Sequence, residues 1–336
     1  MSQHYLLSSK SRTLKLKEIF KLSDKKAFDI FKNIRWKEGK PVCPNCKSVN
    51  KYWLLASKQF KCKACKKKFS LTSGTIFQDR KLSLQDYLGA IAIMTNASKG
   101  YSMVQLSRDL GVQYKTAFVL AHKIRESLMN HRNLSLMEGE IEIDATYIGG
   151  KVKEENIKDN RIDRRLKEFL SPNKRAIIVL KQRCNNGLSR TLTFVRNSEN
   201  QKDVNSIVEN YVSKQSTVYA DESNAYDLLH AKYTMKRVNH SVEYANIKIN
   251  ANINQAESFF SRLKRAYVGQ HHHFGTDYLA YYVNEMAYRE DMRRTDNKNV
   301  FNDTLYKALN SGLSLRLRGY WKKNWKKNMK NESIYS

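Results

Sequence analysis

Four of the five cysteines in the sequence stand in two pairs whose spacing suits a metal site. Cys43 and Cys46 form the first pair, 15 residues follow, and Cys62 and Cys65 form the second. This C-x2-C spacing is typical of a zinc ribbon, in which four thiolates fill the tetrahedral shell of one Zn²⁺. No ligand position is left for a substrate, so we predict a structural zinc. Two disulfides are the alternative, which the lack of an apolar signal-peptide block in the first 20 residues disfavours.

Three acidic residues further along the chain could bind divalent cations together. Asp144 and Asp221 end runs that alternate as strands do, and Glu257 lies in an amphipathic helical stretch. Carboxylates at strand ends lie at the edge of an α/β sheet, where ligands bind, although a single strand-end aspartate usually only caps a turn. Carboxylate oxygens suit Mg²⁺, and two metal ions about 3.5–4 Å apart stabilise both the attacking and the leaving oxygen of a phosphoryl transfer. The three acids therefore indicate metal-dependent phosphodiester chemistry.

The predicted helix that carries Glu257 also carries a suitably placed cation. Lys264 follows seven residues later, so the two side chains project from one helix face about 10.5 Å apart. A carboxylate for metal and a lysine for phosphate suit DNA lying along the helix, although an ordinary amphipathic surface helix is the simpler interpretation. His240, at the end of the preceding predicted strand, could hydrogen-bond the scissile phosphate or merely cap that strand.

A mixed α/β layer of roughly 150 residues must position these groups. Apolar runs with strand periodicity predict strands at 140–148, 176–180, 191–195, 216–221 and 234–238. Helices are predicted at 203–212, 225–231 and 254–268. A basic stretch at 151–175 that contains Ser-Pro-Asn predicts an exposed insertion in this layer.

Residues 82–130 predict helices that could contact DNA. After a helix over 82–94, a short helix from Ser102 ends at Gly111, and a longer helix runs from Lys115 to Met129. A helix, a glycine-containing turn and a second helix are typical of the helix-turn-helix motif, whose second helix enters the major groove. An ordinary helical hairpin is the alternative. The residues expected to face DNA are Gln113, Tyr114, Lys115 and Thr116.

The distribution of charge indicates a polyanionic partner. The 336 residues carry a net charge of +29, with 19 basic and four acidic residues in 1–70 and seven and one in 316–336. Basic blocks at both ends of a nearly balanced middle favour nucleic acid over an anionic membrane surface. A hydrophobic content of 41% excludes a wholly disordered polycation, and the longest apolar run is far shorter than the roughly 20 residues of a membrane-spanning helix.

Four blocks of sequence contain the candidate residues in a characteristic order: Glu142–Lys151, Tyr219–Tyr226, Asn239–Ser241 and Gln255–Arg265. Together with the cysteine pairs they resemble bacterial insertion-sequence transposases of the ISXO-like branch. The resemblance covers about residues 30–290, and the 35 residues between Asp221 and Glu257 suit the spacing seen in many DDE transposases. It extends to four further motifs: Arg35-Trp36, Phe69–Thr75, Gly269–His273 and Tyr281–Glu285.

The resemblance implies an RNase H-like catalytic domain in which Asp144, Asp221 and Glu257 bind Mg²⁺ or Mn²⁺ and Lys264 contacts DNA. The family usually has a second acid directly after the first aspartate, where this chain has Ala145. Because neighbouring strand residues face opposite sides of a sheet, we expect that difference to spare the metal site. The expected order is a basic helical segment (1–40), the zinc ribbon (41–75), the helix-turn-helix region (80–132), the catalytic domain (138–292) and a basic tail (293–336).

We therefore expect a soluble, cytoplasmic, nucleoid-associated bacterial DNA transposase that cleaves the ends of its element and joins the freed 3′-hydroxyl groups to target DNA. Its partners would be double-stranded DNA, at the terminal inverted repeats and the target, and a second copy of the chain, because two ends must be held. For the tail, DNA contact, a membrane-surface helix and a solvated segment are alternatives. A transcription regulator, a nuclease without strand transfer and an inactive copy are the rival interpretations.

Overall fold

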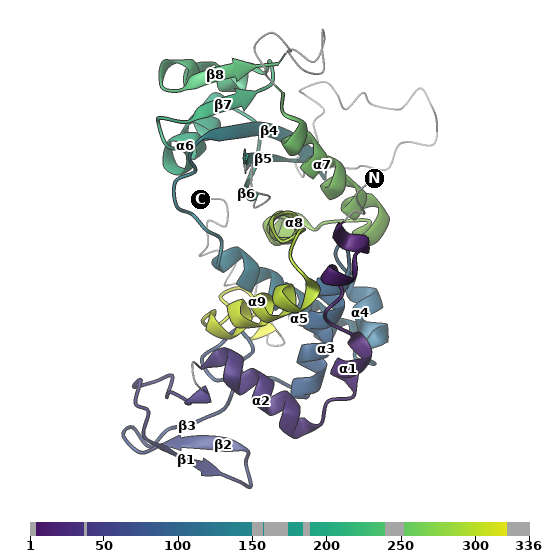
Figure 1. The fold of residues 1–336 in the computed structure, drawn as a ribbon, viewed down its shortest axis with the longest axis vertical. Coiled ribbons are helices and arrows are strands. Elements are labelled where there is room, and N and C mark those ends of the chain that lie inside the picture. Colours follow the sequence, from purple (N-terminus) through teal and green to yellow (C-terminus); the bar gives the residue numbers. More distant parts are fainter. Residues whose placement is uncertain are drawn as a thin grey trace. The chain divides into compact units, whose positions relative to one another are not determined.

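The computed structural model describes residues 5–36, 39–149, 157, 174–183, 189–238 and 252–320. Within these residues the chain forms two compact units (Figure 1). Met1–Arg132 and Met292–Ser333 contribute the first unit, and Asn133–Asp291 the second. Most of the predicted insertion, His240 and the end of the tail lie outside the described residues.

The first unit begins with two helices and a small antiparallel sheet. Helices α1 (Leu16–Phe20) and α2 (Asp24–Arg35) precede strands β1 (Lys51–Leu54), β2 (Gln59–Cys62) and β3 (Lys68–Phe69), in the order β1-β2-β3. The ring of Phe60 lies 6.0 Å from that of Trp36 and 5.4 Å from that of Phe69. The sheet is too small to have much of a core of its own, so it packs on this aromatic cluster at the end of α2.

The segment after β3 is tied to both α2 and the first cysteine pair. The Arg35 guanidinium donates hydrogen bonds to the carbonyl oxygens of Ser70, Leu71 and Ser73. Burial lowers the pKa of Arg35 to about 10, so it stays charged at neutral pH. Gly74 has φ +75°, and a Cβ there would lie 2.9 Å from Pro44, so only glycine fits.

Four further helices complete the first unit: α3 (Leu84–Asn96), α4 (Met103–Asp109), α5 (Tyr114–Asn130) and α9 (Asn297–Asn310). The predicted helices at 82–94, 102–110 and 115–129 are therefore confirmed. Ser83 and Asp86 form a reciprocal capping box at the start of α3. Within the described residues, no helix is long and apolar enough to cross a membrane.

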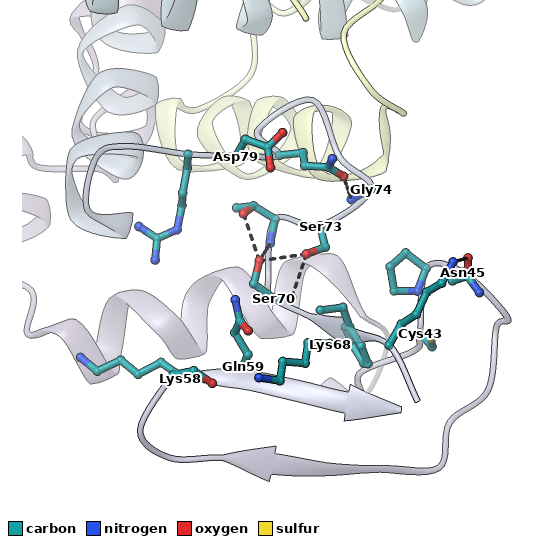
Figure 2. A pocket seen from close by; sticks show the side chains of 16 residues that line it. Cys43, Asn45, Lys58, Gln59, Lys68, Ser70, Ser73, Gly74 and Asp79 are labelled. Carbon is teal, nitrogen blue, oxygen red and sulfur yellow. Dashed lines mark hydrogen bonds between the residues drawn. The ribbon is translucent and has the colours of Figure 1, made fainter. Parts of the chain in front are cut away.

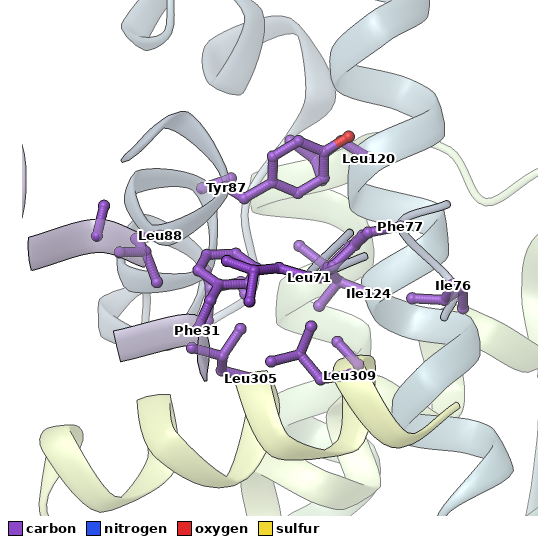
Figure 3. Packing of buried hydrophobic residues seen from close by; sticks show 14 of the residues in the cluster. Phe31, Leu71, Ile76, Phe77, Tyr87, Leu88, Leu120, Ile124, Leu305 and Leu309 are labelled. Carbon is purple, nitrogen blue, oxygen red and sulfur yellow. The ribbon is translucent and has the colours of Figure 1, made fainter. Parts of the chain in front are cut away.

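Helix α9 lies in the segment that was expected to be a basic tail. Its side chains Leu305 and Leu309 pack in the same core as Phe31, Leu88 and Ile124 (Figure 3). The segment after α9 is held as well, because Glu126 accepts hydrogen bonds from the Ser314 hydroxyl and the Leu315 N–H. Apolar residues three or four apart in 301–309 carry the helical signal, which an interpretation based on charge overlooks.

The second unit contains one mixed sheet of five strands (Figure 1). The strands are β4 (Glu140–Ile148), β5 (Arg175–Gln182), β6 (Arg190–Arg196), β7 (Thr217–Ala220) and β8 (Thr234–Arg237). Their order is β6-β5-β4-β7-β8, with antiparallel pairing among the first three and parallel pairing from β4 to β8. This mixed sheet is consistent with the predicted RNase H-like fold.

The helices of the second unit are close to those predicted. They are α6 (Gln201–Tyr211), α7 (Asn254–Ala266), α8 (Leu279–Asp291) and three short elements: the 3₁₀ helices η6 (Asn224–Ala231) and η8 (Thr276–Tyr278), and the π-helical turn η7 (Tyr267–His271) after α7. One core includes Ile141 and Ile143 of β4, Leu180 of β5 and Val204 of α6. Because β4 lies in the centre of the sheet, its residues have fixed neighbours on both sides.

Candidate functional sites

The four paired cysteines meet in a geometry that fits zinc. All four sulfur atoms lie within 4.8 Å of one another, with 3.6 Å between Cys43 and Cys65 and 3.5 Å between Cys46 and Cys62. A tetrahedron of thiolates with Zn–S distances of about 2.3 Å has edges of about 3.8 Å. Without metal, hydrogen bonds from backbone N–H groups, first that of Cys65, lower the pKa of Cys62 to about 6. A hydrogen bond from the Ser48 backbone lowers the pKa of Cys46, but burial and hydrogen bonds with the other three cysteines outweigh it and raise that pKa to about 11, so Cys62 is deprotonated before Cys46. The predicted structural zinc site is therefore supported.

A polar hollow of about 810 Å³ lies beside the ribbon. Figure 2 shows Gln59 and Lys68 of the sheet along one wall, with Ser70 and Ser73 along the other. Cationic and hydroxyl groups that line one hollow can bind phosphate oxygens. The hollow also contains Lys58, Lys67, Arg80 and the acidic Asp79, so its lining has more positive than negative charge.

The residues predicted to read DNA lie at the start of α5. Gln113 is the residue before the first turn, and the Tyr114 side chain is 48% exposed. Lys115 is exposed as well, whereas Thr116 is half-buried. The turn between α4 and α5 includes Gly111 at φ +62°, as a helix-turn-helix connection requires. These side chains are exposed, but their contact with DNA stays a prediction.

Asp144 and Asp221 lie next to each other on adjacent parallel strands. The pairing of β4 with β7 ends at Glu142 and Tyr219, and the same register continued by two residues places Asp221 opposite Asp144. Neighbouring strands are about 4.8 Å apart, so the two carboxylates share one part of the sheet edge. Asp144 is in the middle of β4 and not at its end as expected, because β4 continues to pair with β5 as far as Ile148.

The charges of the predicted acids influence one another. Burial raises the pKa of Asp144 from 3.8 to about 7; the Ala145 N–H opposes this shift, and the negative charges of Asp221, Glu199 and Glu257 add to it. All three predicted acids thus belong to one electrostatic cluster. Their donor atoms are further apart than those of the cysteines, which form the one group of metal-ligating side chains within 4.8 Å among the residues that the structure describes.

Glu257 and Lys264 lie on the exposed face of α7, with Phe259, Phe260 and Leu263 on its buried face. Both side chains are therefore accessible to DNA. Ala145 packs against the hydrophobic core of the unit, which agrees with the expectation that it faces away from Asp144. His240 lies outside the described residues.

A buried acid fixes the start of α7 to β4. Glu142 has a fully buried side chain and stands two residues before Asp144 on the same face of the strand. Its Oε2 accepts a hydrogen bond of 2.8 Å from the N–H of Ala256, and its Oε1 accepts one of 2.7 Å from Arg183. Because Ala256 directly precedes Glu257, this contact positions one predicted acid relative to another.

The other end of α7 is fixed by ion pairs. Arg262 donates two hydrogen bonds, of 2.7 and 2.8 Å, to the Glu290 carboxylate of α8. Glu290 also lies 3.5 Å from the buried Lys181 of β5. Helix α7 is therefore held to the sheet near both its predicted catalytic acid and Lys264.

Replacement of Glu142 by Ala should destabilise the second unit by about 2–4 kcal/mol, because it leaves the buried Ala256 N–H without its acceptor and removes the buried partner of Arg183, which keeps its contacts with Glu140 and Asn252. Glu140→Gln is the matched control: its side chain is 52% exposed and its ion pair with Arg183 contributes about 0–1 kcal/mol. Urea unfolding followed by circular dichroism measures both. A loss below about 1 kcal/mol in the Ala variant would show that Glu142 does not hold α7.

The raised pKa of Asp144 predicts a pH-dependent stability of the metal-free protein. Below its ordinary pKa of 3.8 the carboxyl is neutral in both the folded and unfolded states. As the pH rises to about 7 the unfolded state ionises first, so the folded state loses stability across this window, by a few kcal/mol in order of magnitude. We expect Asp144→Asn to melt at a higher temperature than the wild type at pH 8 in EDTA, and the difference to shrink at pH 5. A difference that does not change with pH would contradict the assigned shift.

The sequence interpretation missed Glu142, Glu199 and Tyr226. The sequence did contain a signal for Glu142, because an acidic residue inside a predicted buried strand needs a hydrogen-bonding or charged partner. Glu199 stands in a polar stretch before a helix, and Tyr226 follows Asp221 in what reads as a short helix, so neither had a signal beyond its residue type.

Comparison with known proteins agrees with this organisation. The model of the ISXO2-like transposase domain matches residues 136–291, and the model of the transposase zinc-ribbon domain matches residues 22–68. A protein of Halobacterium salinarum, described as an uncharacterized protein in transposable element ISH50, is 25% identical over 298 residues, which are 86% of this chain and 98% of that protein. Both matched domains are those of transposases, which implies binding to DNA. The chain therefore contains an ISXO2-like transposase domain where the structure has its mixed sheet, and a transposase zinc-ribbon domain where it has its cysteine site.

Proposed function

We propose that this transposase cleaves a phosphodiester bond at each end of its element and joins the freed 3′-hydroxyl to target DNA. The observation that carries this proposal is that Asp221 lies opposite Asp144 by the strand register and that the negative charges of Asp221 and Glu257 both act on Asp144. The family match supports a transposase role, and the cluster supports the chemistry.

The donor set of the cluster fits Mg²⁺ or Mn²⁺. Its groups are carboxylate oxygens, which these ions prefer over nitrogen or sulfur ligands. Burial is the main cause of the raised pKa of Asp144 and the like charges around it add to the shift, so a cation placed among these charges would relieve their repulsion. Asp144, Asp221 and Glu257 would hold the ions, which when bound supply positive charge to the scissile phosphate and its attacking and leaving oxygens.

The other residues bind and orient the DNA. Lys264, on the same exposed face of α7 as Glu257, would contact a phosphate about two helical turns away. The start of α5, with Gln113, Tyr114, Lys115 and Thr116, would enter a groove, and the polar hollow beside the ribbon would take the backbone. His240 is proposed as an accessory group for the scissile phosphate. Two element ends imply at least a dimer on DNA.

The test uses the full-length, zinc-loaded protein, Mg²⁺ or Mn²⁺, and a labelled duplex that carries the terminal inverted repeat of the element. We expect cleavage at the end of the repeat and a product joined to a target plasmid, both lost when Mg²⁺ and Mn²⁺ are left out of the reaction. Cleavage without joining would instead show a nuclease. Binding without strand breakage would show a regulator or an inactive copy.

A further inference from the structure

The cluster contains a fourth carboxylate that the family assignment does not supply. We propose that Glu199 is a further ligand position for the divalent cations held by Asp144 and Asp221, an inference that rests on the proposed function. The backbone around it, two buried polar atoms and the surrounding charges support this role.

The backbone brings Glu199 to the part of the sheet edge that contains Asp144. Strand β6 ends at Arg196, which pairs with Ala176 of β5, and Ala176 in turn pairs with Tyr147 of β4. The chain leaves β6 there and enters α6 at Gln201. The Glu199 N–H donates a hydrogen bond of 3.0 Å to the Tyr147 hydroxyl, which fixes Glu199 against the strand that carries Asp144.

Two polar atoms near Glu199 are buried and make no hydrogen bond of standard geometry among the described residues, although they lie near enough to each other for the Tyr226 hydroxyl to lower the pKa of Glu199. They are Oε1 of Glu199 itself and the hydroxyl of Tyr226, whose side chain is 0% exposed. Buried polar atoms without partners are rare in folded proteins and point to a ligand or ion that completes them. Tyr226 belongs to η6, directly after the loop in which the Ser223 N–H donates a 2.9 Å hydrogen bond to Asp221.

The charges around Tyr226 place it among the acids. After burial, the negative charges of Glu199, Asp221 and Asp144 are what raise its pKa well above the ordinary value. The Tyr226 hydroxyl therefore stays protonated. It can donate a hydrogen bond to one oxygen of a neighbouring carboxylate and so orient the other oxygen toward a metal ion. Burial raises the pKa of Glu199 as well, and the charge of Asp221 adds to this shift, whereas hydrogen bonding by the Tyr226 and Ser223 hydroxyls opposes it. Four acids so close together require either protons or cations between them.

The simpler alternative is that Glu199 is protonated and only fills space next to Tyr226. It makes a different prediction, because the neutral and isosteric Glu199→Gln would then bind metal as the wild type does. We expect instead that this variant binds Mn²⁺ about 10- to 100-fold more weakly. Electron paramagnetic resonance of free Mn²⁺, titrated into the full-length zinc-loaded protein without DNA, measures the affinity independently of activity.

Two further variants make the result specific. Glu138→Gln is the same chemical change at an exposed acid before the start of β4, and it should leave the Mn²⁺ affinity unchanged. Asp221→Asn reports on the triad itself. If Asp221→Asn loses Mn²⁺ and Glu199→Gln does not, the inference about Glu199 is wrong and the proposed function stands. If Glu199→Gln loses Mn²⁺ and Asp221→Asn does not, Glu199 binds metal and the assigned triad is wrong.

Folding is checked by melting each zinc-loaded variant without added Mg²⁺ or Mn²⁺. Glu199→Gln removes one of several like charges and should melt at the wild-type temperature or above. If it fails to fold, Glu199→Asp takes its place, because a side chain shorter by one methylene withdraws the carboxylate and should weaken Mn²⁺ binding by a smaller factor. Wild-type affinity in the folded variant overturns the proposal.

Discussion

Replacement of Asp221 by Asn should abolish both strand cleavage and joining, with a loss of about 10³-fold or more, and should leave DNA binding intact. Asp221 follows the last residue of β7 and, by the register of β4 with β7, lies opposite Asp144. An amide of the same size keeps the backbone and the hydrogen bond from Ser223 but removes the negative charge that would hold a cation. Labelled-duplex assays measure the chemistry, and electrophoretic mobility shifts measure the binding.

Asp227→Asn is the matched control for this variant. Asp227 is an exposed acid in η6, and its 2.9 Å ion pair with Arg237 is of the surface kind that contributes about 0–1 kcal/mol. It should retain wild-type cleavage and joining. Joining by Asp221→Asn would refute the triad, whereas a loss of DNA binding by that variant would show that Asp221 supports the fold and not the chemistry.

Removal of the zinc is expected to unfold the ribbon while the helical core of the first unit stays folded. Three short strands bury few side chains, so the metal supplies the main stabilisation, on the order of 10 kcal/mol in comparable small zinc domains. Cys62→Ala should lower the zinc content from one ion per chain to none and expose residues 41–69 to protease. The core that contains Phe31, Leu88 and Leu305 extends to Cys43 and Cys62, but most of its buried side chains come from the helices, so the unit should keep its helical circular dichroism.

Cys184→Ala, a cysteine outside both pairs, is the control and should keep the zinc. DNA affinity should fall in Cys62→Ala, because the polar hollow is built on the ribbon and contains Cys43. A Cys62→Ala protein that still binds one zinc and resists protease would contradict the assigned ligand set. Zinc is measured by mass spectrometry of the purified protein.

Local patterns were enough to predict most of the secondary structure. The alternation in 140–148 and the apolar runs at 176–180 and 191–195 appear as β4, β5 and β6, because a strand in a sheet with two covered faces selects these side chains. The cysteine spacing likewise predicted which four sulfur atoms would meet, because each C-x2-C pair is a local structure that brings its two thiols together. The buried face of α9 was missed because charge dominated the interpretation of 293–336, although its periodicity was present.

The sequence by itself therefore determined the elements, the zinc ligands and the residue types that could carry phosphodiester chemistry, because each depends on short-range spacing. Only the tertiary structure decided that Asp144 lies within β4, that Asp221 stands opposite it, and that Glu199 and Tyr226 share their surroundings. It also decided that Glu142 fixes the start of α7. These relations arise from strand register and from contacts between buried residues up to 114 positions apart, such as Glu142 and Ala256. No local sequence pattern encodes them.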